Sequence, residues 1–224
     1  MKQSIAVLGL GKYGMSLAKS LYDMGADVLV ADRNKSVLED MENHCSACIQ
    51  ADLCDEEEVL GLGLKNMDVV VTAMGGNLAA SIMCVSVAKD LGVPLIIAKS
   101  SSTRMGKILE KVGATKVIDP EEQGGVRSAR ILASETVLDY FQIDRSLCMI
   151  EMKTQPKWEG KNLIELDLRR KRKINVVAVK EPNGTWQLAD PEKPLKESYK
   201  LLAILARDDL SRFSDMPDPL AWKG

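Results

Sequence analysis

The sequence is poor in aromatic residues and in histidine, and it lacks long apolar runs. Phenylalanine, tryptophan and tyrosine make up 4% of the 224 residues, and His44 is the single histidine. One histidine disfavours an enzyme built on histidine acid–base catalysis. No apolar run approaches the roughly 20 residues that a membrane-spanning helix needs. The sequence therefore predicts no membrane span.

An excess of charge of either sign is also absent. Thirty lysines and arginines stand against 32 aspartates and glutamates, so the formal net charge is −2. No overall field draws the chain to nucleic acid or to acidic lipid, and we expect no nucleic-acid partner. Residues 1–3 lead directly into an apolar run, which leaves no room for a signal peptide. We therefore expect a cytosolic protein, one that can still dock on a membrane protein.

The five cysteines are an odd number, which argues against a disulfide framework in a cytosolic chain. Cys45 and Cys48 form a C-x-x-C next to His44, with Cys54 nearby. A zinc site would normally show a second well-spaced pair, and none is present. Both residues also fall in a predicted helix-to-strand connection, where small, half-buried side chains are common. The sequence therefore predicts no disulfide framework and disfavours a metal or redox role.

The most informative segment that is present is an apolar run, residues 4–8, leading into a G-x-G-x-x-G turn. Gly9 permits the tight turn, Gly11 lets a pyrophosphate approach the backbone, and Gly14 lets the following helix pack against the strand. The first turn of that helix would point free N–H groups and a positive dipole end at phosphates. The segment predicts a nucleotide-binding turn.

A second apolar run, residues 28–31, ends at Asp32, about 20 positions after the glycines, where dinucleotide-binding folds grip a ribose. The Asp32 carboxylate would accept hydrogen bonds from the 2′- and 3′-hydroxyls and would repel a 2′-phosphate. Arg33 beside it leaves NADP as a minor alternative.

Further apolar runs at 47–51, 68–73, 94–98 and 116–118 alternate with helical segments. This alternation predicts an α/β fold, a Rossmann-like doubly wound parallel sheet over the first 120 residues. Ligands of such sheets bind beyond the carboxyl ends of the strands. For Lys99 and Glu121 a solvated strand end is the competing interpretation. The candidate cofactor-binding residues at these ends are Gly9, Gly11, Lys12, Tyr13, Gly14, Asp32, Arg33, Asn34, Asp52, Leu53, Ala73, Met74, Gly75, Lys99 and Glu121.

A long helix is predicted from Gly124 to about Phe141. It carries one apolar stripe at helical spacing and two apolar residues, Ile131 and Leu138, on the opposite face. A helix that is apolar on two sides must be covered on two sides, so we expect it to contact its own sheet and another subunit. The stripe comprises Val126, Ala129, Ala133, Val137 and Tyr140.

The remainder predicts a small α+β domain, with strands at 147–152, 175–179, 186–188 and 201–205 and helices at 162–170 and 208–213. We find no nucleophile–base pair or metal-ligand cluster in it. A basic run, residues 169–173, follows the first of these helices, where a solvated helix end is the favoured interpretation. A phosphate-bearing ligand is the second. The predicted organisation is thus 1–122, a nucleotide-binding domain; 123–143, a crossover helix; and 144–224, the small domain.

Seven segments in order carry a family resemblance: GLGKYG (9–14), ADRN (31–34), QADL (50–53), VTAMGGN (71–77), AKS (98–100), GATKVIDPE (113–121) and the two-faced helix. In this order the chain resembles the RCK, or TrkA-type, regulators of potassium channels and transporters. Within them it is most similar to the KtrA-type subunits of Ktr potassium-uptake systems. The resemblance covers essentially the whole chain.

The resemblance implies a cytosolic regulatory subunit and not an enzyme. Such subunits form dimers that assemble into octameric rings beneath a membrane potassium-translocating subunit of the KtrB or TrkH kind, at the inner face of the membrane. KtrA-type members hold ATP or ADP, and TrkA-type members are associated with NAD(H). Lys12 matches a basic residue that reaches phosphate. Glu121 matches an acid that helps hold a divalent or monovalent cation at the phosphates.

The resemblance further implies that the small domain binds cyclic di-AMP at its own dimer interface. The matching positions are Leu163, Ile164, Asp167, Leu168, Arg169, Asn175, Val176, Ala178 and Pro191.

Two other interpretations stay open. An NAD-dependent oxidoreductase would also use the glycine turn, although no tyrosine of the chain has a lysine four positions later, as short-chain reductases do. A soluble NAD or redox sensor without a membrane partner is the other.

Overall fold

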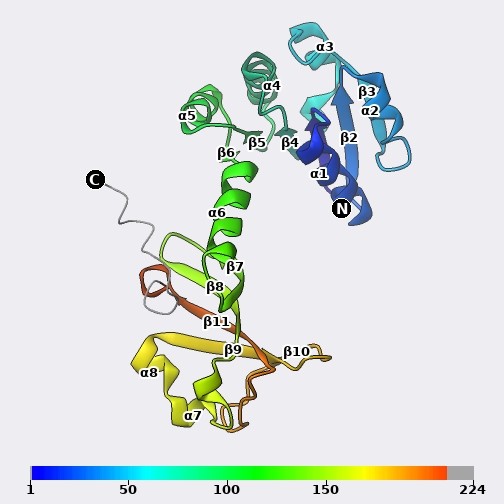
Figure 1. Ribbon diagram of the computed structural model, residues 1–224. Helices are drawn as coiled ribbons and strands as arrows, with labels where there is room; N and C mark the ends of the chain where they lie inside the picture. Colours follow the sequence, from blue (N-terminus) through cyan, green and yellow to red (C-terminus); the bar gives the residue numbers. More distant parts are fainter. Residues whose placement is uncertain (1, 211–224) are drawn as a thin grey trace. The chain divides into compact units, whose positions relative to one another are not determined.

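The computed structural model describes residues 2–210. It divides into two compact units, Met1–Glu122 and Gln123–Gly224 (Figure 1). Each unit has its own sheet, and α6 (Pro120–Leu132) begins in the first unit and continues in the second. No helix of the described residues is both long enough and apolar enough to cross a membrane.

The first unit contains a six-stranded parallel sheet of order β3-β2-β1-β4-β5-β6. The chain order reverses between β1 and β4, which is the switch point at which such sheets bind ligands. The doubly wound sheet is therefore confirmed. Its strands are β1 (Ser4–Leu8), β2 (Asp27–Asp32), β3 (Ala47–Gln50), β4 (Val69–Thr72), β5 (Leu95–Lys99) and β6 (Lys116–Ile118).

Both faces of this sheet are covered at its centre, where β1, β2 and β4 are apolar and buried along most of their length. On β1, Ala6 and Leu8 belong to one buried cluster, while Ile5 and Val7 belong to another. A strand sends alternate side chains to opposite faces, so these two clusters are the two layers of the core. The helices of this unit, before α6, are α1 (Lys12–Asp23), α2 (Lys35–Glu39), α3 (Glu56–Gly61), α4 (Leu78–Asp90) and α5 (Thr103–Val112), with a 3₁₀ turn, η1, at Leu64–Asn66.

Polar caps begin four of these helices. The side chains of Asn34, Asp55, Asn77 and Ser102 accept hydrogen bonds from backbone N–H groups in the first turns of α2, α3, α4 and α5. Such caps satisfy amides that have no partner within the helix. Helix α2 is short and ends at Glu39.

The predicted long helix to Phe141 is wrong in its second half. Helix α6 ends at Leu132, and Val137–Gln142 form a strand, β7. The Ser134 hydroxyl accepts hydrogen bonds from the backbone N–H groups of Thr136, at 3.2 Å, and of Val137, at 3.1 Å. A side chain that satisfies these amides stabilises a turn in place of a further helical turn. Tyr140, placed on the apolar stripe of that helix, lies instead on a strand.

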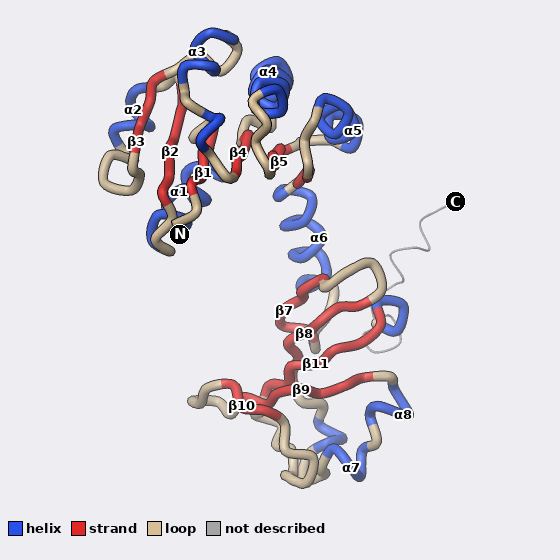
Figure 2. The backbone as a smooth tube through the Cα atoms, turned by 180° about the vertical axis from the view of Figure 1, so that it is seen from behind, coloured by secondary structure: helices blue, strands red, loops and turns tan. Residues whose placement is uncertain are grey.

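The second unit contains a five-stranded antiparallel sheet of order β10-β9-β11-β8-β7. Figure 2 shows this sheet with the short helices α7 and α8 beside it. One apolar cluster packs on it, including Ile150, Trp158 and Leu201. The remaining elements are β8 (Leu147–Lys153), η2 (Pro156–Trp158), α7 (Leu163–Leu166), α8 (Leu168–Arg172), β9 (Ile174–Lys180), β10 (Trp186–Leu188), β11 (Lys200–Ala206) and η3 (Arg207–Asp209).

The single helix predicted over 162–170 is two helices. Asp167 lies between α7 and α8 in the left-handed region, at φ 45°, which interrupts the helix. The basic run therefore forms α8 itself and does not follow a helix end; Lys173, also left-handed at φ 60°, ends it. The helix predicted over 208–213 is represented by η3, and its later residues lie outside the described range.

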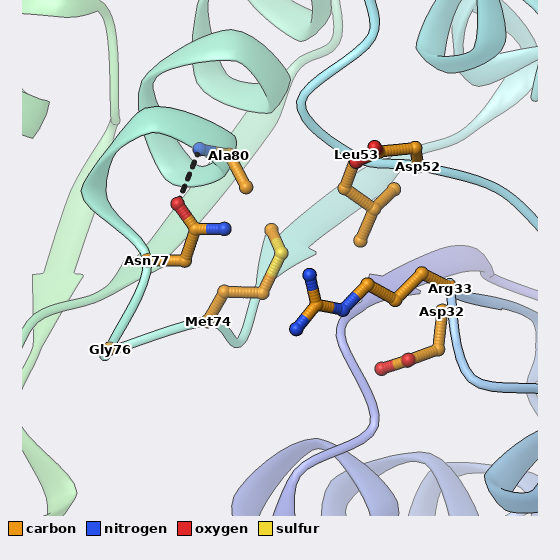
Figure 3. Close-up of a pocket in the computed structure, with 8 residues that line it drawn as sticks. All are labelled: Asp32, Arg33, Asp52, Leu53, Met74, Gly76, Asn77 and Ala80. Atoms are coloured by element: carbon orange, nitrogen blue, oxygen red, sulfur yellow. Dashed lines mark hydrogen bonds between the residues drawn. The ribbon is translucent and has the colours of Figure 1, made fainter.

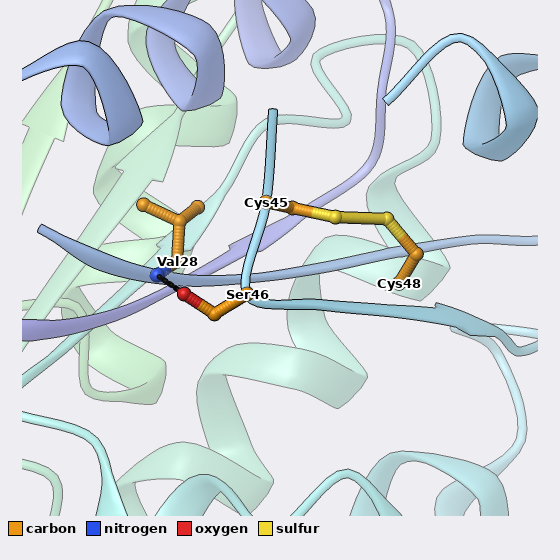
Figure 4. Close-up of a disulfide and its surroundings, with 4 residues drawn as sticks. All are labelled: Val28, Cys45, Ser46 and Cys48. Atoms are coloured by element: carbon orange, nitrogen blue, oxygen red, sulfur yellow. Dashed lines mark hydrogen bonds between the residues drawn. A yellow bond between two sulfur atoms is a disulfide. The ribbon is translucent and has the colours of Figure 1, made fainter. Parts of the chain in front are cut away.

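A disulfide joins Cys45 and Cys48, in contrast to the prediction from cysteine number (Figure 4). Between them Ser46 is held against β2: its N–H donates to the Val28 carbonyl at 2.8 Å, and its hydroxyl accepts from the Val28 N–H at 3.2 Å. These bonds fix the connection into β3 and keep the two cysteines close. Cysteine count carries no information about this local geometry.

Candidate nucleotide-binding site

A cleft of about 350 Å³ opens at the carboxyl ends of β2, β3 and β4 (Figure 3). Five of the predicted residues line it, at the ends of three strands. Its lining is Asp32, Arg33, Asp52, Leu53, Met74, Gly76, Asn77 and Ala80.

The Asp32 carboxylate joins the end of β2 to the glycine turn. One oxygen accepts the backbone N–H of Leu10 at 2.7 Å, and the other accepts that of Asn34 at 2.9 Å. A carboxylate oxygen has two lone-pair positions, so each retains one acceptor position for a ribose hydroxyl. Asp32 can thus hold the turn and a diol together.

The glycine turn leaves space in front of its backbone at Gly11. Gly9 has a φ of +93°, which favours glycine, and a Cβ on Gly14 would lie 2.0 Å from the Gly9 carbonyl oxygen. A Cβ on Gly11 would meet no atom within 4 Å. Gly11 is also the N-cap of α1 and makes no side-chain cap. This geometry fits the tight turn predicted at Gly9 and the close packing predicted at Gly14. It also fits the open approach for phosphate predicted at Gly11.

Arg33 and the apolar side chains shape the interior of the cleft. Figure 3 shows the Arg33 guanidinium pointing into the cleft toward Met74, with Leu53 across from it. A guanidinium and two apolar side chains offer surfaces on which a flat base can stack. Asp52 is held by its own neighbours: its N–H donates to Glu58 at 2.7 Å, and its carboxylate accepts the Cys54 N–H at 3.0 Å.

Gly76, Asn77 and Ala80 are cleft residues that the sequence reasoning missed. The Asn77 side chain caps α4 by accepting the Ala80 N–H at 3.1 Å, which brings the start of α4 to the cleft. The available signal was the asparagine itself, because it follows a strand and a glycine pair and precedes a helix.

Lys99 and Glu121 form an ion pair beside the glycine turn, outside the cleft lining. Their Nζ and Oε1 atoms are 2.6 Å apart, and the hydrogen bond from Lys99 lowers the pKa of Glu121. The Lys99 side chain is 12% exposed and lies 5.7 Å from the centre of the Tyr13 ring. A Cβ on Gly75 would lie 3.2 Å from the Cε atom of Lys99. Four predicted residues that are distant in sequence, Tyr13, Gly75, Lys99 and Glu121, are thereby connected.

Within residues 2–210, no group of three or more histidine, cysteine, aspartate or glutamate side chains is arranged to hold a metal ion. Among these residues, Glu121 has no such companions for a cation site.

The TrkA-N domain family model matches residues 5–120, more than half of the chain. The chain belongs to the TrkA-N family.

Relatives of this TrkA-N chain span nearly its whole length. Ktr system potassium uptake protein C of Bacillus subtilis is 33% identical over 215 residues, covering 95% of the chain and 96% of the relative. Ktr system potassium uptake protein A of the same organism is 31% identical over 213 residues, again with 95% and 96% covered. The predicted family resemblance is confirmed.

Among solved structures, the GsuK RCK domain superposes on the TrkA-N chain with a TM-score of 0.66 at 18% identity. The match covers 96% of this chain and 47% of that one. The GsuK channel bound to NAD has a TM-score of 0.63 at 17% identity, covering 94% of this chain and 38% of that one. At these identities the likeness establishes the fold.

The positions predicted for cyclic di-AMP divide by burial in the TrkA-N chain. Leu168 and Ala178 are 4% and 7% exposed and belong to the interior, whereas Ile164 is 61% exposed. Arg169 and Asn175 are exposed as well. Pro191 is another of these positions, and its carbonyl accepts the backbone N–H of Ile164 at 3.4 Å.

Proposed function

We propose that this chain is a nucleotide-sensing regulatory subunit of a Ktr-type potassium-uptake system, and not an enzyme. The observation that carries the proposal is its similarity to two Ktr potassium uptake proteins along 95% of its length. The cleft at the switch point of a doubly wound sheet supplies the sensing site. The partner is a membrane potassium-translocating subunit, which the chain contacts from the cytoplasm. Dimers of the chain assemble into an octameric ring.

The ligand we propose for the cleft is ATP or ADP. Asp32 accepts the ribose hydroxyls at its two remaining lone-pair positions. The base stacks among Arg33, Leu53 and Met74. The phosphates lie over the open backbone at Gly11, at the start of α1, where N–H groups and the helix dipole favour negative charge.

The Lys99–Glu121 pair suggests how the two nucleotides differ in effect. A terminal phosphate near Lys12 and Lys99 adds negative charge that competes with Glu121 for the lysine. Glu121, once released, is available to a cation, with the remaining ligands coming from the phosphates and a partner subunit. ADP lacks the terminal phosphate. A ligand shifts a conformational equilibrium only by its differential affinity for the two states. The contacts of the terminal phosphate, which ATP has and ADP lacks, therefore change the conformation that the transporter partner senses.

NAD(H) is the alternative ligand, because Asp32 and the glycine turn suit any nucleotide with a free ribose diol. A cyclic di-AMP site at the small-domain positions Ile164, Arg169 and Asn175 is proposed on the family resemblance. An NAD-dependent oxidoreductase is less favoured, because the chain has one histidine.

The test is potassium uptake by the reconstituted transporter, with ATP and then ADP on the side of this subunit. We expect the two nucleotides to give different uptake rates. Lys12→Gln and Glu121→Gln should each reduce that difference, because each removes a charge on which only the triphosphate depends. Lys111→Gln, on the exposed end of α5, is the matched control. Unchanged discrimination in both variants would refute the mechanism, and steady NADH turnover with carbonyl substrates would favour an enzyme.

A further inference from the structure

A second cleft, in the unit of residues 123–224, has four basic residues around an apolar floor. Its volume is about 210 Å³. The residues come from η2, the loop after it, the end of α7, and α8 (Figure 2). They are Lys157, Trp158, Lys161, Leu166, Leu168, Lys171 and Arg172. Of the residues that the structure describes, no acidic side chain lines it.

The floor and the backbone that carries the lysines are fixed by the fold. Trp158 is 3% exposed and Leu168 is 4% exposed, and both belong to the apolar cluster under the five-stranded sheet. The N–H of Lys161 donates to the Trp158 carbonyl at 3.1 Å, and the Lys161 carbonyl accepts from Leu195 at 2.9 Å. The apolar floor and the Lys161 backbone are therefore held in place by packing and backbone bonds, and the exposed basic side chains extend from that frame.

The charges of this cleft are not balanced locally. Within residues 2–210, no ion pair involves Lys157, Lys161, Lys171 or Arg172. Like charges around one depression repel one another, and a bound anion relieves that repulsion.

Two of the nearby carboxylates accept backbone hydrogen bonds. Glu159 accepts the backbone N–H of Glu197. Glu165 accepts the N–H of Asn162 at 3.1 Å, which completes the capping box of α7. Neither these two nor Asp167, which lies between Leu166 and Leu168 in the sequence, is among the described residues that line the cleft.

We propose that this cleft binds a phosphate-bearing anion, with the four cations on the phosphate and Trp158, Leu166 and Leu168 against its apolar part. The volume is below the range of about 300–1,000 Å³ that is usual for drug-sized ligands, so it suits a phosphate or pyrophosphate group with a small substituent. Only Leu168 is shared with the positions predicted for cyclic di-AMP. This is a separate site, and its ligand is either a soluble phosphate compound or the headgroup of an anionic phospholipid.

The probe for the test is inorganic pyrophosphate, titrated into the full chain. The chain has three tryptophans, and the double substitution Trp186→Phe/Trp222→Phe leaves Trp158, in the cleft floor, as the reporter. We expect saturable change in its emission. Adding Lys161→Gln/Lys171→Gln should weaken binding about tenfold, since two charge-assisted contacts at a partly solvated site are lost. Because Lys161→Gln/Lys171→Gln leaves the glycine turn of the other unit unchanged, loss of affinity in this variant distinguishes the two sites.

The matched control is Arg145→Gln/Lys153→Gln, which removes the same charge from exposed positions of the same unit. It should leave the affinity unchanged. Unchanged Trp158 emission, or an equal loss of affinity in the control pair, would overturn the proposal.

Vesicle sedimentation then separates the two sources of phosphate. Binding to vesicles of phosphatidylcholine with equimolar phosphatidylglycerol, lost in the Lys161/Lys171 variant and competed by pyrophosphate, identifies the headgroup. Pyrophosphate binding without vesicle binding identifies a soluble ligand. Both results support the site.

Discussion

Substitution of Gly14 by alanine tests whether the glycine turn is set by backbone contact between α1 and β1. The new Cβ would lie 2.0 Å from the Gly9 carbonyl oxygen and 3.1 Å from the Ala73 Cβ. Carbon–oxygen contacts are about 3.3 Å or longer, so the start of α1 has to move by more than about 1 Å. The obstacle is backbone, which cannot rotate away as a side chain would.

The expected cost is at the upper end of the 1–3 kcal/mol that is usual for overpacking, about 3 kcal/mol of unfolding free energy. With a urea slope of about 2 kcal/mol/M, the unfolding midpoint of Gly14→Ala falls by about 1.5 M. Circular dichroism in urea measures it. Nucleotide affinity should fall as well, because the N-terminus of α1 is displaced from the phosphates.

Gly11→Ala is the matched control for stability. Its Cβ meets nothing within 4 Å, and its φ of −64° is allowed for alanine. We expect its unfolding free energy to stay within about 1 kcal/mol of the wild type, since the poorer N-cap and the stiffer unfolded chain oppose each other. Its nucleotide affinity should still drop, because the methyl group occupies the approach to the backbone. A Gly14→Ala protein as stable as the wild type would refute this reasoning. Equal losses of unfolding free energy in Gly14→Ala and Gly11→Ala would refute it as well.

Three further predictions concern other contacts. Cys45→Ser/Cys48→Ser should lower the unfolding free energy by at most about 2 kcal/mol, as expected for a bridge between residues three apart; urea unfolding with and without reductant measures this, and a difference that persists in reductant would contradict it. The Arg127 guanidinium, bound to both oxygens of Asp139, lowers the pKa of that carboxyl. Its contribution to stability is therefore present above the unfolded pKa of about 3.9 and is lost as the pH falls through the lower folded value; Asp139→Asn should flatten unfolding-midpoint profiles below about pH 4, and a profile parallel to the wild type would contradict this. Asn77→Ala removes the cap of α4 and should cost about 1 kcal/mol in urea unfolding, while an unchanged midpoint would show that the cap is dispensable.

The nucleotide-binding half of the fold was predictable because its signals are local and agree. Apolar strands alternate with capped helices, a glycine turn follows β1 and β4, and the central strands β1, β2 and β4 are buried on both faces. The alternation of strands and helices predicts that β2 ends at Asp32, and the Asp32 carboxylate lies in the cleft as expected.

The remainder depends on contacts that are distant in sequence. Val137–Gln142 have apolar residues at spacings that also fit a helix, but they pair with β8 in the sheet, and pairing overrides the local pattern. Asp167 interrupts a helix by adopting a left-handed conformation, which the neighbouring residues in the sequence do not predict. The Lys99–Glu121 pair joins the ends of two elements, so the sequence could predict both residues as candidates but not their contact.

Calorimetric titration of the full chain with ATP, ADP and NADH tests the central claim most directly. We expect ATP and ADP to bind with one site per chain, to displace each other, and to be displaced only poorly by NADH. Absence of ATP and ADP binding, or NADH binding more tightly than either, would contradict it.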